Sequence, residues 1–278
     1  MVAITGAMGF LGSHLLASIP HSISIQRDVR TNEKRFNEWL DLHRPETVIH
    51  CAGLADVRLS IAHPGMAYES NTVGTITLLN CLEGRNIKLI YIATDKVFGA
   101  QERCEFFTPY RPISPYDASK VAAEVIFNDW SKRNIGVLAR FPNFYGWDDP
   151  HTERLIPSVL KAIASKTTEF SVRTYKDARR QYIFIDDAVA LVKRLLELPN
   201  EGSKHHFGPR IIKSVRQVVE DLCREFGASM TLHEERLPGE APSLSIEHST
   251  PLPVTFTTWE DSLKIIVDRV KAQTYFSQ

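Results

Sequence analysis

Short apolar runs alternate with helical patterns along the first half of the chain. The run at residues 89–93 is continuous, which is typical of a strand buried on both faces, whereas residues 22–26 alternate between polar and apolar positions. Strands are expected at residues 2–5, 22–26, 47–51, 89–93 and 137–141. Helices are expected to begin at Leu11, at Thr31 as a cap, near Met66 and at Tyr116.

This alternation predicts an α/β fold with a Rossmann-like, doubly wound parallel sheet. In such sheets ligands bind beyond the carboxyl ends of the strands. The residues at those ends are Gly6, Asp28, Ala52, Thr94 and Phe141. We therefore expect these residues to gather at one edge of the sheet. One helix–strand pair of a full βαβαβ half is missing before Asp28.

Beyond Gly146 the regular alternation of predicted strands and helices ends. Ser214 and Gln217 have the spacing of a capping box, and Gly227 suits the end of the helix that follows. Further helices are expected at residues 155–164 and from Thr258 onward. We expect residues 1–146 to form a nucleotide-binding domain to which residues 181–200 return. Residues 147–180 and 201–278 would form a smaller C-terminal α/β lobe that binds the substrate.

Three glycines follow the first strand at a G-x-x-G-x-x-G spacing, namely Gly6, Gly9 and Gly12. A diphosphate can sit on a helix N-terminus only where no side chain separates it from the backbone N–H groups. Gly6 would permit the tight turn, Gly9 would let the backbone reach the diphosphate, and Gly12 would let the helix pack on the strand. Such a cluster also occurs in plain loops, but its position directly after a strand favours dinucleotide binding.

Tyr116 and Lys120 lie four positions apart, so their side chains share one helix face. A phenol with a pKa of about 10 is a poor acid or base at neutral pH, and a nearby ammonium lowers that pKa. Tyr116 could then exchange a proton with a sugar hydroxyl or carbonyl, while Thr94 hydrogen-bonds the same oxygen. The same spacing is common on solvated helices. The order of glycine loop, Thr94 at a strand end and Tyr116-x-x-x-Lys120 favours the catalytic interpretation.

The composition is that of an ordinary globular protein, with 278 residues of which 43% are hydrophobic and 24% charged. Basic and acidic residues each number 33, so the charge balance suggests neither nucleic acid nor an anionic membrane as a partner. The cysteines form no C-x-x-C pair and are expected to be free thiols rather than metal ligands. There is neither a signal-peptide pattern nor an apolar run long enough for a bilayer, so we expect a cytoplasmic protein.

The motifs together resemble the extended short-chain dehydrogenases/reductases of the NAD-dependent epimerase/dehydratase type. The matching segments occur in the family's order and extend from residue 2 to about residue 190. They are residues 5–13, 50–53, 71 with 74–75, 94–99, 114–120, 140–146 and 182–187. The resemblance implies an enzyme with NAD or NADP as cofactor, a nucleotide-diphosphate sugar as ligand, and a homodimer as one expected assembly.

The resemblance also implies roles for individual residues. Tyr116 would be the acid/base, Lys120 would lower its pKa and bind the nicotinamide ribose, and Thr94 would hold the reacting oxygen. Cofactor contacts would come from Gly6, Gly9, Phe10, Leu11, Gly12, Asp28, Val29, Cys51, Ala52, Gly53, Lys120 and Phe141, with Asp28 facing the adenine. Asn143 and either Arg179 or Arg180 would hold the sugar diphosphate, since a guanidinium binds phosphates bidentately.

Within this family, the short chain and the order of Thr94-Asp95 before Val97-Phe98 resemble dTDP-4-dehydrorhamnose reductases. Reduction of a 4-keto-6-deoxysugar nucleotide at C4 is therefore the main expectation. Lys96 departs from that pattern, because the reductases usually have Tyr there.

Thr94-Asp95-Lys96 resembles some nucleotide-sugar 4,6-dehydratases, in which the Asp protonates the departing C6 hydroxyl and the Lys removes the C5 proton. A dehydratase or an epimerase that uses Asp95 and Lys96 is thus the alternative. A basic Lys96 would need burial, whereas a solvated or ion-paired Lys96 would have no such role. A non-catalytic NAD(P)-binding regulatory protein is a second alternative.

Arg27 and Arg30 near Asp28 would favour NADP, whereas an acid at that position would favour NAD. His205-His206 has no partner at ligand spacing and is interpreted as a surface or strand-edge pair. Asp186-Asp187 begins a helix and is interpreted as complementing the helix dipole.

Overall fold

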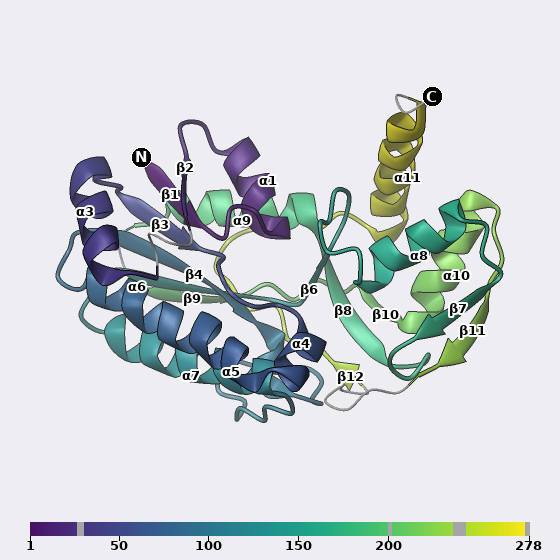
Figure 1. Ribbon diagram of the computed structural model, residues 1–278, viewed down its shortest axis with the longest axis horizontal. Coiled ribbons are helices and arrows are strands. Elements are labelled where there is room, and N and C mark those ends of the chain that lie inside the picture. The colour runs from purple at the N-terminus through teal and green to yellow at the C-terminus, as the bar shows by residue number, and fades with distance from the viewer. Residues whose placement is uncertain (27–30, 200–201, 236–242, 276–278) are drawn as a thin grey trace.

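A computed structural model describes residues 1–26, 31–199, 202–235 and 243–275, without the side chains of 273–275. Asp28 and Val29, both expected to contact a cofactor, lie outside the described residues. Figure 1 shows a large sheet flanked by helices, beside a smaller lobe that carries the C-terminal helix.

The large sheet has six strands in the order β2-β1-β3-β4-β5-β9, and every neighbouring pair is parallel. The strands are β1 (Val2–Thr5), β2 (Ile23–Ile25), β3 (Thr47–His50), β4 (Lys88–Thr94), β5 (Gly136–Phe141) and β9 (Ser203–His206). The first five are those expected from the apolar runs. The carboxyl ends of β1, β3, β4 and β5 therefore meet at one edge of the sheet.

Helices cover both faces of this sheet, which confirms the doubly wound arrangement (Figure 1). On one face Ile49 and Ile90 pack into a core with α1 (Phe10–Ser18) and α9 (Ile185–Glu197). On the other face the preceding residues, Val48 and Leu89, pack into a second core. That core includes side chains of α3 (Glu33–His43), α6 (Gly74–Leu82) and α7 (Pro115–Trp130). Successive residues of one strand thus enter opposite cores.

The segment between β3 and β4 is more broken than the expected helix over 66–82. It contains α4 (Val57–Ala62), α5 (Pro64–Ala67) and the π-helical turn η1 (Tyr68–Val73), and α6 follows directly. A 3₁₀ turn, η2 (Asp95–Phe98), follows β4. The cap of α3 is Asn32, whose side chain accepts a hydrogen bond from Arg35 N at 3.1 Å, so the expected cap at Thr31 is wrong by one position.

The smaller lobe contains two short sheets. In the first, β8 (Arg179–Phe184) pairs with β6 (Asn143–Tyr145), β10 (Ile212–Ser214) and β12 (Ser243–Leu244). In the second, β7 (Glu169–Val172) pairs with β11 (Thr231–Glu234). The helices are α8 (Leu155–Ala164), α10 (Val215–Phe226) and α11 (Trp259–Tyr275). The expected capping box of Ser214 and Gln217 is present, and Gly227 ends α10 with φ +64°.

The course of the chain differs in detail from the expected lobe boundaries. Helix α9 returns to the large sheet as expected, but residues 181–184 belong to β8 of the smaller lobe. Strand β9 lies in the large sheet, although residues 201–278 were assigned to the smaller lobe. His205 and His206 are buried, so the prediction that they lie on the surface is wrong. The alternative prediction, that they lie in an edge strand, is confirmed, because β9 is at the edge of the sheet.

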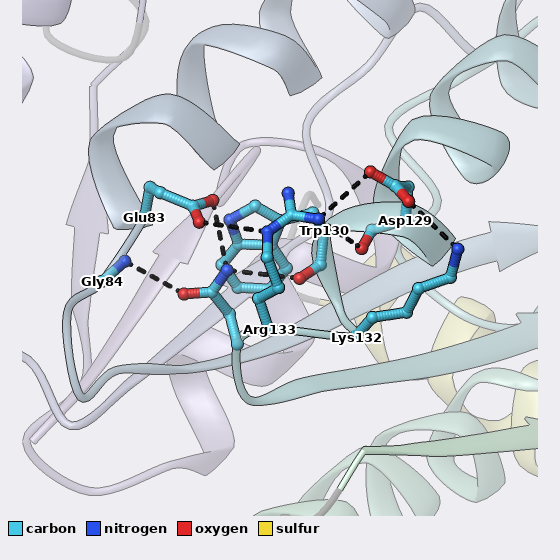
Figure 2. Close-up of polar contacts among 7 residues, drawn as sticks. Glu83, Gly84, Asp129, Trp130, Lys132 and Arg133 are labelled. Atoms are coloured by element: carbon cyan, nitrogen blue, oxygen red, sulfur yellow. Dashed lines mark hydrogen bonds and ion pairs between the residues drawn. The ribbon is translucent and has the colours of Figure 1, made fainter.

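Polar contacts join the segments that follow the C-terminal ends of α6 and α7 (Figure 2). Asn134 accepts a hydrogen bond from Gly84 N at 3.0 Å and donates to Glu83 at 3.1 Å. Arg133 forms ion pairs with two acids: its Nη1 lies 3.3 Å from Asp129 Oδ2, and its Nε lies 3.6 Å from Glu83 Oε1. All of the charged side chains in this group are exposed, so they fix the helix ends at little gain in stability. The four cysteines are free, as expected, and none of the described helices has the length and apolar character needed to cross a membrane.

Candidate active site

A cavity of about 820 Å³ opens at the carboxyl edge of the large sheet and extends to the smaller lobe. All described residues that we expected at the cofactor line it. They are Gly6, Gly9, Phe10, Leu11, Gly12, Cys51, Ala52, Gly53, Lys120 and Phe141. Thr94, Asp95, Lys96, Tyr116, Asn143 and Arg180 line the same cavity. The fold therefore brings the expected cofactor, catalytic and substrate residues to one place.

The glycine loop presents bare backbone to this cavity. Gly6 has φ +68°, and a Cβ there would lie 2.6 Å from Ala52 N. A Cβ on Gly12 would overlap the carbonyl of Gly6. Helix α1 begins after Gly9 without a side-chain cap, so its first N–H groups remain available to an anion. This loop fits the diphosphate of a dinucleotide.

Tyr116 and Lys120 project from α7, whose first turn is capped by Ser114 through Asp117 N at 3.1 Å. Lys120 Nζ donates a hydrogen bond to Ile92 O at 3.2 Å, which fixes the ammonium against β4. Burial raises the pKa of Tyr116, while the Lys120 charge and a hydrogen bond with Thr94 act in the opposite direction. Lys120 thus lowers the pKa of Tyr116, as expected, but burial raises this pKa by more.

Asp95 is the most unusual acid of the cavity. Its side chain is 1% exposed, and burial raises its pKa to about 6 against the opposing effects of Lys96 and Thr94. Thr94 donates a hydrogen bond to Asp95 Oδ1 at 3.3 Å, and Oδ2 has no hydrogen-bond partner among the described residues. A carboxyl with a raised pKa can serve as a proton donor near neutral pH.

Lys96 follows Asp95 in η2 and lines the cavity, but its side chain is only half-buried. Its removal from water is therefore only partial, in contrast to that of Asp95. The Lys96 charge opposes the burial that raises the pKa values of Asp95 and Asp117. Lys96 thus lies within electrostatic reach of two carboxyls.

The structure separates the two candidate arginines of β8. Arg180 is 6% exposed and lines the cavity, whereas Arg179 is exposed and is not among the lining residues. Asn143 Nδ2 donates to Gln181 O at 3.1 Å, which orients the amide beside the same strand. Arg58, Arg154 and Arg173 also line the cavity and were not predicted, because only the folded chain brings these separate segments together.

Asn71 is a further cavity residue to which the sequence motif gave no role. It lies in the π-helical turn, accepts a hydrogen bond from Leu54 N at 2.7 Å and donates to Ser119 Oγ at 2.9 Å. It therefore connects the cavity loop after β3 with the helix that carries Tyr116. Insertions of this kind in a helix occur frequently at functional sites.

A family model described as the NAD dependent epimerase/dehydratase family matches residues 2–208. This chain belongs to that family. The match confirms the family that the sequence motifs indicated. The family's description names NAD, which is one of the two expected cofactors.

Two relatives of this epimerase/dehydratase chain are named dTDP-glucose 4,6-dehydratase. The one from Mycolicibacterium smegmatis is 29% identical over 66% of this chain and 56% of its own length. The one from Haemophilus influenzae is 27% identical over 80% of this chain and 78% of its own length. The chain thus spans little more than half of the first relative. These names favour our dehydratase or epimerase alternative over the reductase.

Solved structures share the fold along nearly the whole chain. The dTDP-glucose 4,6-dehydratase DesIV from Streptomyces venezuelae, crystallised with NAD, has a TM-score of 0.87 at 20% identity, covering 99% of this chain and 98% of that one. UDP-glucose 4-epimerase from Thermus thermophilus, also with NAD, has a TM-score of 0.84 at 21% identity, covering 97% and 98%. At these identities the likeness establishes the fold.

Proposed function

We propose that this protein is an NAD-dependent nucleotide-sugar 4,6-dehydratase. The observation that carries the proposal is the buried Asp95, whose raised pKa and free Oδ2 make it a proton donor in the same cavity as Tyr116. A reaction limited to C4 has no need of a second acid. Loss of a C6 hydroxyl does, because hydroxide is a poor leaving group unless it is protonated.

The chain's own residues would divide the chemistry as follows. The glycine loop and Lys120 would hold NAD, which supplies reversible hydride transfer when it is bound. Tyr116 in its phenolate form would take the proton of the C4 hydroxyl, with Thr94 on the same oxygen. The Lys120 charge and the Thr94 hydrogen bond favour that form, and burial opposes it. Asp95 would give its proton to the C6 hydroxyl as the C6–O bond breaks, and Lys96 would take the C5 proton. The hydride taken from C4 would be delivered to C6 and the proton taken from C5 would return to C5, while the proton gained by Tyr116 replaces the one given by Asp95 through solvent. The net change would then be loss of one water with no net oxidation or reduction.

The substrate's diphosphate would lie against Asn143 and Arg180. Arg180 is the better candidate of the β8 pair because it lines the cavity, whereas Arg179 is exposed. Arg58, Arg154 and Arg173 line the same cavity, but each pairs with a lining carboxylate, that of Asp56, Asp149 or Glu153, so the positive charge they add is largely offset. A substrate phosphate could bind these guanidinium groups by replacing the carboxylates.

Product mass and cofactor stoichiometry test this proposal. The purified chain would be incubated with NAD and either dTDP-glucose or UDP-glucose, and the sugar nucleotide analysed by mass spectrometry. A dehydratase gives a product lighter by one water without net consumption of cofactor. A reductase would instead consume added NADH or NADPH one for one with a 4-keto sugar nucleotide. Failure of every substrate to react would favour the non-catalytic binding alternative.

A 4-epimerase is the second candidate, and the half-buried Lys96 favours it. Epimerisation at C4 needs no C5 base, so it does not require Lys96 to be neutral. In the same experiment an epimerase would give an isomer of unchanged mass, separable by chromatography.

A further inference from the structure

A buried ion pair lies behind the catalytic lysine and is used by none of the chemistry above. Glu124 of α7 and Arg140 of β5 are each 2% exposed and form an ion pair. Neither residue lines the cavity. Burying two charges is costly unless both are well paired, so a pair at this position calls for a reason.

Neighbouring groups hold the pair in place. Tyr110 donates a hydrogen bond to Glu124 Oε1 at 2.7 Å, and the Arg140 guanidinium lies 4.8 Å from the centre of the Phe98 ring. Arg140 also contacts His206 Nε2. Burial, and then the Arg140 charge, lowers the pKa of His206 to about 3, so this imidazole is neutral and adds no charge.

Glu124 lies one helical turn beyond Lys120, on the face of α7 that carries Tyr116. Lys120 Nζ lies 4.7 Å from the centre of the Tyr91 ring on β4, so its ammonium packs against the strand rather than extending into water. Removal from water lowers the pKa of Lys120, and three groups act against that loss, namely Tyr116, Glu124 and Cys51.

Only one of these three groups carries a negative charge near neutral pH. Burial raises the pKa of Tyr116, and it raises that of Cys51 to about 12, so both are protonated. Glu124 forms the buried ion pair with the Arg140 guanidinium, so its carboxylate supplies the negative charge. Among the groups that support the Lys120 ammonium, Glu124 is therefore the anion.

We propose that Glu124, held by Arg140 and Tyr110, is a positioning residue that keeps Lys120 charged against the floor of the cavity. The inference rests on the proposed function in one respect, since that function gives the Lys120 charge its catalytic use. Glu124 itself does not reach the cavity and acts only through Lys120.

The charge of Lys120 can be measured without turnover. The purified chain would be labelled with trace acetic anhydride between about pH 6 and pH 11, and acetylation of Lys120 followed by peptide mass spectrometry. In Glu124→Gln the midpoint of Lys120 labelling should fall by about one pH unit, which gives roughly tenfold more acetylation at a pH below both midpoints. Lys88, buried at the start of β4, is an internal control whose midpoint should not move.

Two further variants make the result specific. Glu124→Asp keeps the carboxylate and should keep the wild-type midpoint. Glu83→Gln removes an exposed acid near the far end of α7 (Figure 2) and should leave Lys120 unchanged. Circular dichroism would show whether Glu124→Gln folds. If it does not, the double variant Glu124→Gln/Arg140→Met would be labelled in its place, because it leaves no unpaired buried charge. An unchanged Lys120 midpoint in the folded variant would overturn the proposal.

The pH profile of turnover separates this role from a structural one. Loss of the Lys120 charge at lower pH should move the alkaline limb of kcat/KM in Glu124→Gln to lower pH, whereas a merely structural defect would lower the rate equally at every pH. If the wild type turns over no sugar nucleotide, the proposed function fails, yet the labelling experiment still decides the role of Glu124. A wild-type alkaline limb in a folded Glu124→Gln would overturn the positioning role alone.

Discussion

The side-chain amide of Asn71 donates a hydrogen bond of 2.9 Å to the hydroxyl of Ser119, three residues beyond Tyr116. The same amide accepts from Leu54 N at 2.7 Å and donates to Leu54 O at 3.1 Å. Asn71 is 2% exposed, so water cannot replace these bonds. One buried side chain thus holds the cavity loop after β3 at a fixed position relative to the catalytic helix.

Replacing Asn71 by Ala should lower the free energy of unfolding by about 2–4 kcal/mol, because the buried polar groups of Leu54 and Ser119 lose their partner. Denaturant unfolding followed by circular dichroism measures this. Asn80→Ala is the matched control, since Asn80 donates at 2.9 Å to the exposed Glu33 and should change stability by less than about 0.5 kcal/mol. Equal effects of the two substitutions would contradict the connecting role of Asn71.

Gly12→Ala should impair cofactor binding, because the new methyl group would overlap the carbonyl of Gly6 and displace the glycine loop. We expect the Kd for NAD to rise at least about tenfold, equivalent to about 1.4 kcal/mol, in a fluorescence titration. Gly65→Ala is the control, because a Cβ there meets no atom within 4 Å. NAD binding as tight in Gly12→Ala as in the control would remove this loop from the cofactor site.

Asp95 should make the folded state less stable as the pH rises. Its pKa is raised to about 6 in the folded protein from the ordinary 3.8, so the folded state binds more protons between these values and unfolding becomes easier with rising pH. Relative to Asp95→Asn, the wild type should lose about 2–3 kcal/mol of unfolding free energy between about pH 4 and pH 7. Urea unfolding of both proteins across that range measures the difference, and parallel pH curves would show that Asp95 is not a buried acid.

Tyr116→Phe should lower turnover of the sugar nucleotide by a factor of about 100 to 10,000, because the acid/base is lost while the ring remains. Binding of NAD should be retained, which a titration checks. Tyr68→Phe alters a tyrosine that is 42% exposed and should leave the rate unchanged. A Tyr116→Phe rate near that of the wild type would exclude this phenol from the chemistry.

The sequence predicted most of the large sheet because its strands are apolar runs buried on both faces, a pattern that depends little on distant residues. Strand β9 was missed because Ser203–His206 is polar. His205 can be buried because both ring nitrogens have hydrogen-bond partners: Nε2 lies 2.9 Å from Ser203 Oγ, and Nδ1 lies 2.7 Å from Thr250 Oγ1. No local sequence pattern predicts such partners.

The candidate site was predictable where short motifs carry it and unpredictable where the fold assembles it. The glycine loop and the Tyr116–Lys120 pair follow from their spacing together with their position and order along the chain. Arg58 and Arg173 come from separate segments, and the burial of Asp95 depends on its surroundings in the folded chain. For the same reason the sequence could not decide between reductase and dehydratase, since the burial of Asp95, on which the dehydratase proposal rests, is a property of the fold.

The return of β9 to the edge of the large sheet has a practical consequence for dissecting the molecule. The polypeptide passes from one part to the other and back before its last helices, so no single cleavage point separates the two parts (Figure 1). A fragment that ends at Leu198 would uncover the backbone of β5, whose N–H and C=O groups could then pair with another copy. Shortened versions of this protein should therefore tend to aggregate on expression, whereas a nicked chain should stay together.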